Sequence, residues 1–143
     1  MSCVVGPVAG DLDGDSRPEI IVMVGGANPA GYYILEADGS DWSDSTVDIA
    51  VPPKPGAGNL GTTEPAIADF DKDGTAEIVV VHSSGDVYIL PHTGGSTTVF
   101  EYKSDQPTDT PGGSPRIADV DENGSAEVII GNDVFEIQGT NLV

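Results

Sequence analysis

Basic side chains are scarce in this chain of 143 residues. Only 5 lysines and arginines stand against 24 aspartates and glutamates, so the formal net charge at pH 7 is −19. This balance excludes nucleic acid as an expected partner, because binding to a phosphate backbone requires a basic surface. Insertion into a membrane, or binding to an anionic membrane surface, is not expected either.

Cysteines, histidines and long apolar runs are also scarce. With Cys3 as the single cysteine, no internal disulfide can form, and we expect a buried or terminal thiol. No segment reaches the roughly 20 consecutive apolar residues of a membrane-spanning helix. No signal peptide precedes the first repeat, which fits a mature or excised segment of an exported protein. His82 and His92 are more typical of surface residues than of a catalytic pair, and we expect no enzymatic activity.

Acidic loops, by contrast, are abundant. One nine-residue pattern occurs three times, and it carries oxygen-bearing side chains at its positions 1, 3, 5 and 9. The copies are DLDGDSRPE at 11–19, DFDKDGTAE at 69–77 and DVDENGSAE at 119–127. Each copy leads directly into a short apolar run rich in valine and isoleucine. The repeat indicates one structural unit used three times.

The segments around each loop are typical of β-strands. A short apolar segment precedes the loop, a β-branched run follows it, and an alternating segment comes after a turn. No segment has the 3.6-residue periodicity of an amphipathic helix. The loops begin 58 and 50 residues apart, near the period of β-propeller blades, which is about 40–50 residues. We therefore predict an all-β chain of four-stranded antiparallel units, with weaker fourth strands at 45–51 and 97–102.

The loop pattern predicts a cation site in each unit. Ca²⁺ takes about six to eight oxygen ligands, and alternate positions of a short loop can supply them. The absence of neighbouring His or Cys disfavours zinc and copper, and Mg²⁺ is the second choice. We predict up to three structural Ca²⁺ ions, bound by the side chains at positions 1, 3, 5 and 9 and by the carbonyl at position 7. These ligands are Asp11, Asp13, Asp15, Arg17 and Glu19; Asp69, Asp71, Asp73, Thr75 and Glu77; and Asp119, Asp121, Asn123, Ser125 and Glu127.

Two other interpretations of the loops compete with a metal site of this kind. Asp, Asn and Gly populate turns without any metal, but converging carboxylates repel one another unless a cation is present. An EF-hand requires a glutamate at position 12 and helices on both sides, whereas position 12 here is Val22, Val80 or Ile130 within an apolar strand. The first loop is the weakest of the three on backbone grounds, because Ser16 stands at position 6, where a positive φ favours glycine.

The three units resemble the FG-GAP/VCBS repeat family, known from the integrin α-subunit head and from bacterial surface and secreted proteins. The resemblance rests on residues 6–22, 65–80 and 115–130. It implies propeller blades with Ca²⁺ in the loop between the first two strands of each blade. We expect blade 1 at about 4–51, a Pro/Gly-rich connector at about 52–63, blade 2 at about 64–103, a linker at about 104–113 and a short blade 3 at about 114–143.

Three blades form an incomplete propeller, because closed propellers have about 4–8 blades. We expect self-association through open blade edges, into a closed ring or a filament, or completion by other segments of a longer chain. A homo-oligomer or polymer is therefore the expected state.

The expected function is that of an extracellular or cell-surface module with a structural, adhesive or binding role, which contacts a glycan or a surface protein. The alternative is the non-catalytic or substrate-binding part of a secreted carbohydrate-active enzyme. Trp42 and Tyr32 would then form a sugar-stacking patch, although packing between strands is the competing role for these rings.

Overall fold

The computed structural model describes residues 2–3, 6–25, 31–40, 64–81, 85–90, 102–104, 106–110, 113–138 and 141–143. Within these ranges the chain forms strands and turns and no helix, which confirms the all-β prediction. Accordingly, none of this part of the chain contains a helix long and apolar enough to cross a membrane.

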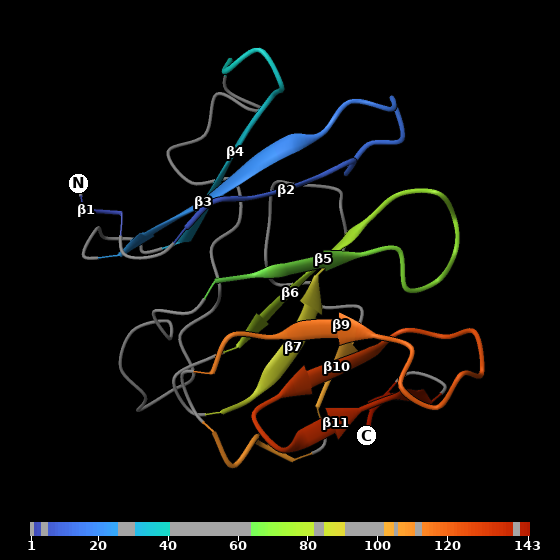
Figure 1. Ribbon diagram of the computed structural model, residues 1–143. Helices are drawn as coiled ribbons and strands as arrows, with labels where there is room; N and C mark the ends of the chain where they lie inside the picture. The colour runs from blue at the N-terminus through green and yellow to red at the C-terminus, as the bar shows by residue number, and fades with distance from the viewer. Residues whose placement is uncertain are drawn as a thin grey trace.

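The strands form three antiparallel sheets and a small hairpin (Figure 1). The first sheet contains β1 (Ser2–Cys3), β2 (Val8–Gly10), β3 (Glu19–Gly25) and β4 (Gly31–Leu35). The second contains β5 (Ala66–Ala68), β6 (Glu77–Val81), β7 (Val87–Leu90) and β8 (Tyr102–Lys103). The third contains β9 (Arg116–Ala118), β10 (Glu127–Ile130) and β11 (Asp133–Phe135), and the hairpin joins β12 (Ile137–Gln138) to β13 (Asn141–Leu142).

The unit shared by the three sheets is a three-stranded meander, not the predicted four-stranded one. It comprises β2-β3-β4, β5-β6-β7 and β9-β10-β11. A fourth strand, β8, extends the second meander close to the predicted segment 97–102, whereas the segment 45–51 lies outside the described residues. The end of the chain instead folds into the β12–β13 hairpin, and Leu142 forms a parallel bridge with Ser104 beside the second sheet.

The three sheets lie in layers, with the second sheet between the first and the third (Figure 1). Along β6, Ile78 and Val80 pack toward the first sheet, whereas Val79 and Val81 pack toward the third. Every residue of β6 and β7 is buried as a result. A strand that is covered on both faces requires a continuous apolar run, and this requirement explains the Ile78–Val81 segment.

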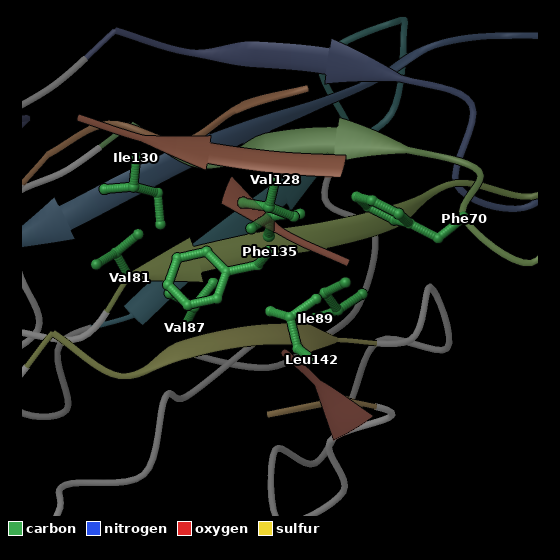
Figure 2. Close-up of a cluster of buried hydrophobic side chains, with 9 residues drawn as sticks. Phe70, Val81, Val87, Ile89, Val128, Ile130, Phe135 and Leu142 are labelled. Carbon is green, nitrogen blue, oxygen red and sulfur yellow. The ribbon is translucent and has the colours of Figure 1, made fainter. Parts of the chain in front are cut away.

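Two hydrophobic clusters join the layers. The first contains Leu12, Ile21, Tyr32, Ile34, Ile78, Val80, Tyr88 and Leu90, from the first and second sheets. The second contains Phe70, Val79, Val81, Val87, Ile89, Val128, Ile130, Phe135 and Leu142 (Figure 2). Each fully buried aliphatic or aromatic side chain contributes about 1.5–3 kcal/mol, so these clusters determine how the sheets stack and hold the loops at their ends.

Candidate metal centre

The three acidic loops occupy equivalent places in the fold. They connect β2 to β3, β5 to β6 and β9 to β10, and they lie on the same side of the molecule (Figure 1). Each is the connection between the first two strands of its meander, as the family resemblance implies. The stacked sheets therefore bring three equivalent loops into one row.

The loops share an unusual backbone. Positions 4 and 6 have a positive φ in every loop, a conformation that side chains other than glycine rarely adopt. The angles are 79° for Gly14 and 70° for Ser16, 63° for Lys72 and 97° for Gly74, and 60° for Glu122 and 87° for Gly124. Ser16 thus adopts the left-handed conformation predicted for its position without being a glycine.

Backbone amides within each loop hold the acidic side chains in place. The N–H of position 6 donates to the carboxylate of position 1: Ser16 to Asp11 at 3.0 Å, Gly74 to Asp69 at 3.0 Å and Gly124 to Asp119 at 2.8 Å. The N–H of position 7 donates to the side chain of position 5: Arg17 to Asp15 at 2.7 Å, Thr75 to Asp73 at 2.8 Å and Ser125 to Asn123 at 2.7 Å. Such bonds fix a turn locally, so the acidic side chains of each loop are held close together.

The glutamate at position 9 is the buried member of each loop. The exposed fraction is 0% for Glu19, 1% for Glu77 and 2% for Glu127. One carboxylate oxygen accepts a hydrogen bond from the N–H of position 2: from Leu12 at 2.6 Å, from Phe70 at 2.7 Å and from Val120 at 2.6 Å. The loop is thereby closed from its second residue to its last.

The second oxygen of this glutamate has no partner among the described residues in the first and third loops. Among the described residues, Oε1 of Glu19 and Oε1 of Glu127 are buried and accept no hydrogen bond. A buried oxygen of a charged group that lacks a partner is costly. A cation beside it would remove that cost.

The pKa of Glu19 also indicates that a cation beside its carboxylate would be favourable. Burial raises the pKa of its carboxyl above the ordinary value of 4.5, while the hydrogen bond from Leu12 partly offsets this rise. The negative charges of Asp13, Glu36 and Asp11 raise the pKa further. A bound cation would favour the ionised form and reverse these effects.

The acidic side chains converge in all three loops. One carboxylate oxygen from each of three residues lies within 4.8 Å of the others: Asp11, Asp13 and Asp15; Asp69, Asp71 and Glu77; and Asp119, Asp121 and Glu127. Each cluster could hold a metal ion. The donors are all oxygens, which suits a hard cation better than zinc or copper.

Two predicted carboxylate ligands, Glu19 and Asp73, lie outside these closest groups. In the third loop, Asn123 donates its side-chain N–H to Asp121 at 2.9 Å, so the amide lies within reach of that cluster. The carbonyls of Arg17, Thr75 and Ser125 stay predicted ligands. The hydrogen bonds seen at these residues are donated by their N–H groups and, in Thr75, also by the side-chain hydroxyl, which donates to Asp73.

The proposed aromatic patch is not supported by the position of Tyr32. This side chain is fully buried in the first hydrophobic cluster, so neither face of its ring is open to a sugar. The competing role, packing between strands, is the one that the structure shows for this ring. Trp42 lies outside the described residues.

Contacts between successive loops were not predicted. Lys72 donates from Nζ to the carbonyl of Gly124 at 2.7 Å, which links the second loop to the third. The N–H of Ala76 donates to the carbonyl of Asp11 at 3.1 Å, which links the second loop to the first. The sequence offered one indication of the contact between the second and third loops: Lys72, one of only five basic residues, stands inside an acidic loop.

Comparison with known proteins identifies the repeat. A family model described as an FG-GAP-like repeat matches residues 11–80 and again residues 69–130. No curated protein and no solved structure matches the chain. The two family matches overlap and together span all three acidic loops and most of the chain. The chain therefore belongs to the FG-GAP-like repeat family.

Proposed function

We propose that this chain is a calcium-stabilised structural or binding module, built of propeller-type blades and acting outside the cell. The observation that carries the proposal is the glutamate at the end of the first and third loops. Glu19 and Glu127 each direct one oxygen to a backbone amide, and each keeps a second, buried oxygen that has no partner in the described part of the chain. A cation beside the neighbouring aspartates would complete both sites.

The donor chemistry favours calcium over other cations. Ca²⁺ accepts an irregular set of carboxylate and carbonyl oxygens, whereas Mg²⁺ requires a near-ideal octahedron and retains several waters. Residues at positions 1, 3, 5 and 9 would hold the ion, together with the carbonyl of position 7. Calcium would neutralise the acidic cluster and lock the loop between the first two strands.

The expected consequence is a fold whose stability depends on the ion. A ligand present at about 100 times its Kd stabilises a protein by about 2.7 kcal/mol per site. Three such sites would rival the stability of a whole domain, which is about 5–15 kcal/mol. Extracellular calcium sites have Kd values of about 10⁻⁴–10⁻³ M. At such a Kd, about 1 mM Ca²⁺ would stabilise the protein by about 0.4–1.4 kcal/mol per site, and about 10–100 mM would be needed to reach 100 times Kd.

The proposed role is structural, adhesive or binding rather than catalytic. The acidic side chains of the three loops converge on the candidate metal sites, and the stacked sheets present those loops in a row. A glycan or a surface protein is the proposed class of partner.

The test is calcium titration by calorimetry, combined with thermal unfolding in millimolar Ca²⁺ and in EGTA. We expect up to three ions per chain and a melting temperature that falls on chelation. In Glu127→Gln, the third site should bind calcium at least about tenfold more weakly, since ligand charge tunes the affinity of such sites.

Glu122→Gln is the matched control, because it makes the same chemical change in the same loop at a position outside the ligand set. It should retain calcium binding close to that of the unaltered chain. A melting temperature that is identical in Ca²⁺ and in EGTA would contradict the proposal, as would equal effects of the two substitutions.

A further inference from the structure

The outer face of the third sheet carries apolar residues whose counterparts in the other sheets are covered. Val120, at position 2 of the third loop, is 54% exposed. The residues at position 2 of the other loops are buried, with Leu12 at 0% and Phe70 at 9%. Val134 is 50% exposed, whereas Ile89, its counterpart in the second sheet, is buried. In the first and second sheets, the equivalent face packs against the following sheet.

The opposite face of the first sheet, called the free face below because no other described sheet packs against it, shows the complementary pattern. Its residues are half-buried, and their counterparts in the second sheet are buried in the contact with the first. Matched through strand register, the pairs are Ile20 with Ile78, Val22 with Val80, Tyr33 with Tyr88 and Leu35 with Leu90. The first sheet therefore retains the face with which a preceding sheet would pack.

The loops supply a second, independent relation between neighbouring sheets. Position 4 of one loop faces positions 6 and 7 of the next. Lys72, at position 4, bonds to the carbonyl of Gly124, at position 6 of the following loop. A Cβ on Gly14, also at position 4, would lie 3.4 Å from Thr75 Cγ2, at position 7 of the following loop.

If the first loop of a second copy followed the third loop in the same arrangement, opposite charges would meet. Position 4 of the third loop is Glu122, and positions 6 and 7 of the first loop are Ser16 and Arg17. All three residues are exposed. In a chain with a net charge of −19 and five basic residues, an arginine at this place in the first loop is a specific complement to the glutamate.

We propose that the outer face of the third sheet binds the free face of the first sheet of a second copy of this chain. Glu122 of one copy then pairs with Arg17 of the other, and Val120 and Val134 become covered. The inference concerns the faces of the sheets rather than their edges, and it goes beyond the proposed calcium function.

Side-chain sizes on the first strands of the three meanders, β2, β5 and β9, agree with this contact. Within the chain, Gly10 on β2 leaves room for Ile67 on β5, since an added Cβ would lie 2.8 Å from Ile67 Cγ2. On the outer face of the third sheet, the exposed Ala118 is the counterpart of Gly10. In the second copy, the small, exposed Ala9 is the counterpart of Ile67, so two alanines would meet where a glycine and an isoleucine meet within the chain.

One backbone contact would be missing between copies. Ala76, at position 8, donates its N–H to the preceding loop, whereas position 8 of the first loop is Pro18, which has no N–H to donate. The contact between copies is therefore weaker than the contacts within the chain. It should appear as a reversible association that depends on concentration and on salt, because exposed charges are screened.

The experiment measures particle mass by light scattering and sedimentation over a range of concentrations in millimolar Ca²⁺. We expect two or more copies per particle, as a closed pair or a longer array. Glu122→Arg and Arg17→Glu should each raise the association Kd at least about tenfold, because like charges then meet. An equimolar mixture of the two variants, or the double substitution, should restore association to within about threefold of the unaltered chain.

Val134→Asp should also abolish association, whereas Val143→Asp should not. Val143 is a matched control, because it is also an exposed valine, but it follows the β12–β13 hairpin rather than lying on the third sheet. A particle of one chain at all concentrations would overturn the inference, and so would association without rescue by charge exchange. Calcium titration of the same samples separates these outcomes from failure of the proposed function, which would show as absence of binding whatever the particle mass.

Discussion

The second and third sheets are built on the same sequence pattern but have different neighbours. The second sheet is covered on both faces, whereas the third contacts another sheet of the described chain on one face only. Phe70 and Val120 stand at the same loop position and donate the same hydrogen bond to a buried glutamate. Phe70 is nevertheless buried in a cluster, and Val120 is exposed. The pattern determines the unit, and the neighbouring unit determines which of its residues form the core.

The largest expected difference between the two sheets is at this shared loop position. Phe70→Ala should destabilise the protein by about 3–5 kcal/mol, because a large buried side chain leaves a cavity when it is truncated. Val120→Ala should change the free energy of unfolding by less than about 0.5 kcal/mol, as is usual for surface substitutions. Urea denaturation in millimolar Ca²⁺, at a concentration where the chain is monomeric, measures both. Equal losses would mean that the exposed valine is covered in solution.

The two faces of the third sheet can be compared on a single strand. Ile130 on β10 is buried against the second sheet, whereas its neighbour Ile129 faces outward and is half-buried. Ile130→Val should cost about 0.5–1.5 kcal/mol, the usual range for loss of one buried methyl group. Ile129→Val should cost clearly less in the monomer. A larger cost at Ile129 would reverse the assignment of inner and outer faces.

The two faces of the first sheet allow a similar comparison, between Tyr32, which packs against the second sheet, and its neighbour Tyr33 on the opposite face. The hydroxyl of Tyr32 is buried and has no partner among the described residues, so Tyr32→Phe should stabilise the protein by about 1 kcal/mol. Tyr33 is half-buried, and Tyr33→Phe should be nearly neutral. Thermal unfolding at neutral pH distinguishes them, and destabilisation by Tyr32→Phe would reveal a partner for the hydroxyl.

The same tyrosine predicts a loss of stability at alkaline pH. Burial raises the pKa of Tyr32 above its ordinary value of 10.0, so the folded state disfavours ionisation. The resulting stability is fully present below pH 10 and is lost as the pH rises above it, because the unfolded chain releases its proton first. Tyr32→Phe should reduce this loss in unfolding experiments between neutral and strongly alkaline pH. An unchanged pH dependence would contradict the assignment.

The smallest expected effect lies in the backbone of the first loop. Ser16 has a φ of 70° at position 6, where the second and third loops have glycine. A left-handed conformation costs about 1–2 kcal/mol for a residue with a Cβ, and glycine loses about 0.5–1 kcal/mol through its greater entropy when unfolded. Ser16→Gly should therefore stabilise the protein by about 0.5 kcal/mol. Ser125→Gly, at a position where φ is not positive, should destabilise it, and thermal unfolding resolves the two signs.

Much of the local structure was predictable because it depends on neighbours in sequence. The apolar runs that follow the loops form β3, β6 and β10, and the alternating segments form β4, β7 and most of β11. Convergence of the acidic side chains was predicted from their alternate spacing, because a nine-residue turn brings them together in each copy. Ligation of a particular ion stays a prediction.

Other features depend on residues far apart in the chain. The ending of the third unit was predicted only as short, but its last residues form a hairpin beside the second sheet, where Leu142 meets Ser104. Tyr32 belongs to an alternating segment, and alternation by itself does not say which face a neighbouring sheet will cover. The link from Lys72 to Gly124 exists because two loops 50 residues apart are stacked side by side.

The sequence by itself determined that this protein consists of a repeated β unit with an acidic loop between its first two strands, because turn chemistry and strand periodicity are local. Only the tertiary structure decided that β6 and β7 are buried on both faces and that Val120 and Val134 are exposed. It also decided that Glu19 and Glu127 each keep a buried oxygen without a partner among the described residues. The physical reason is that burial is a property of a residue and its spatial neighbours. Three nearly identical units therefore acquire different surfaces according to their place in the stack.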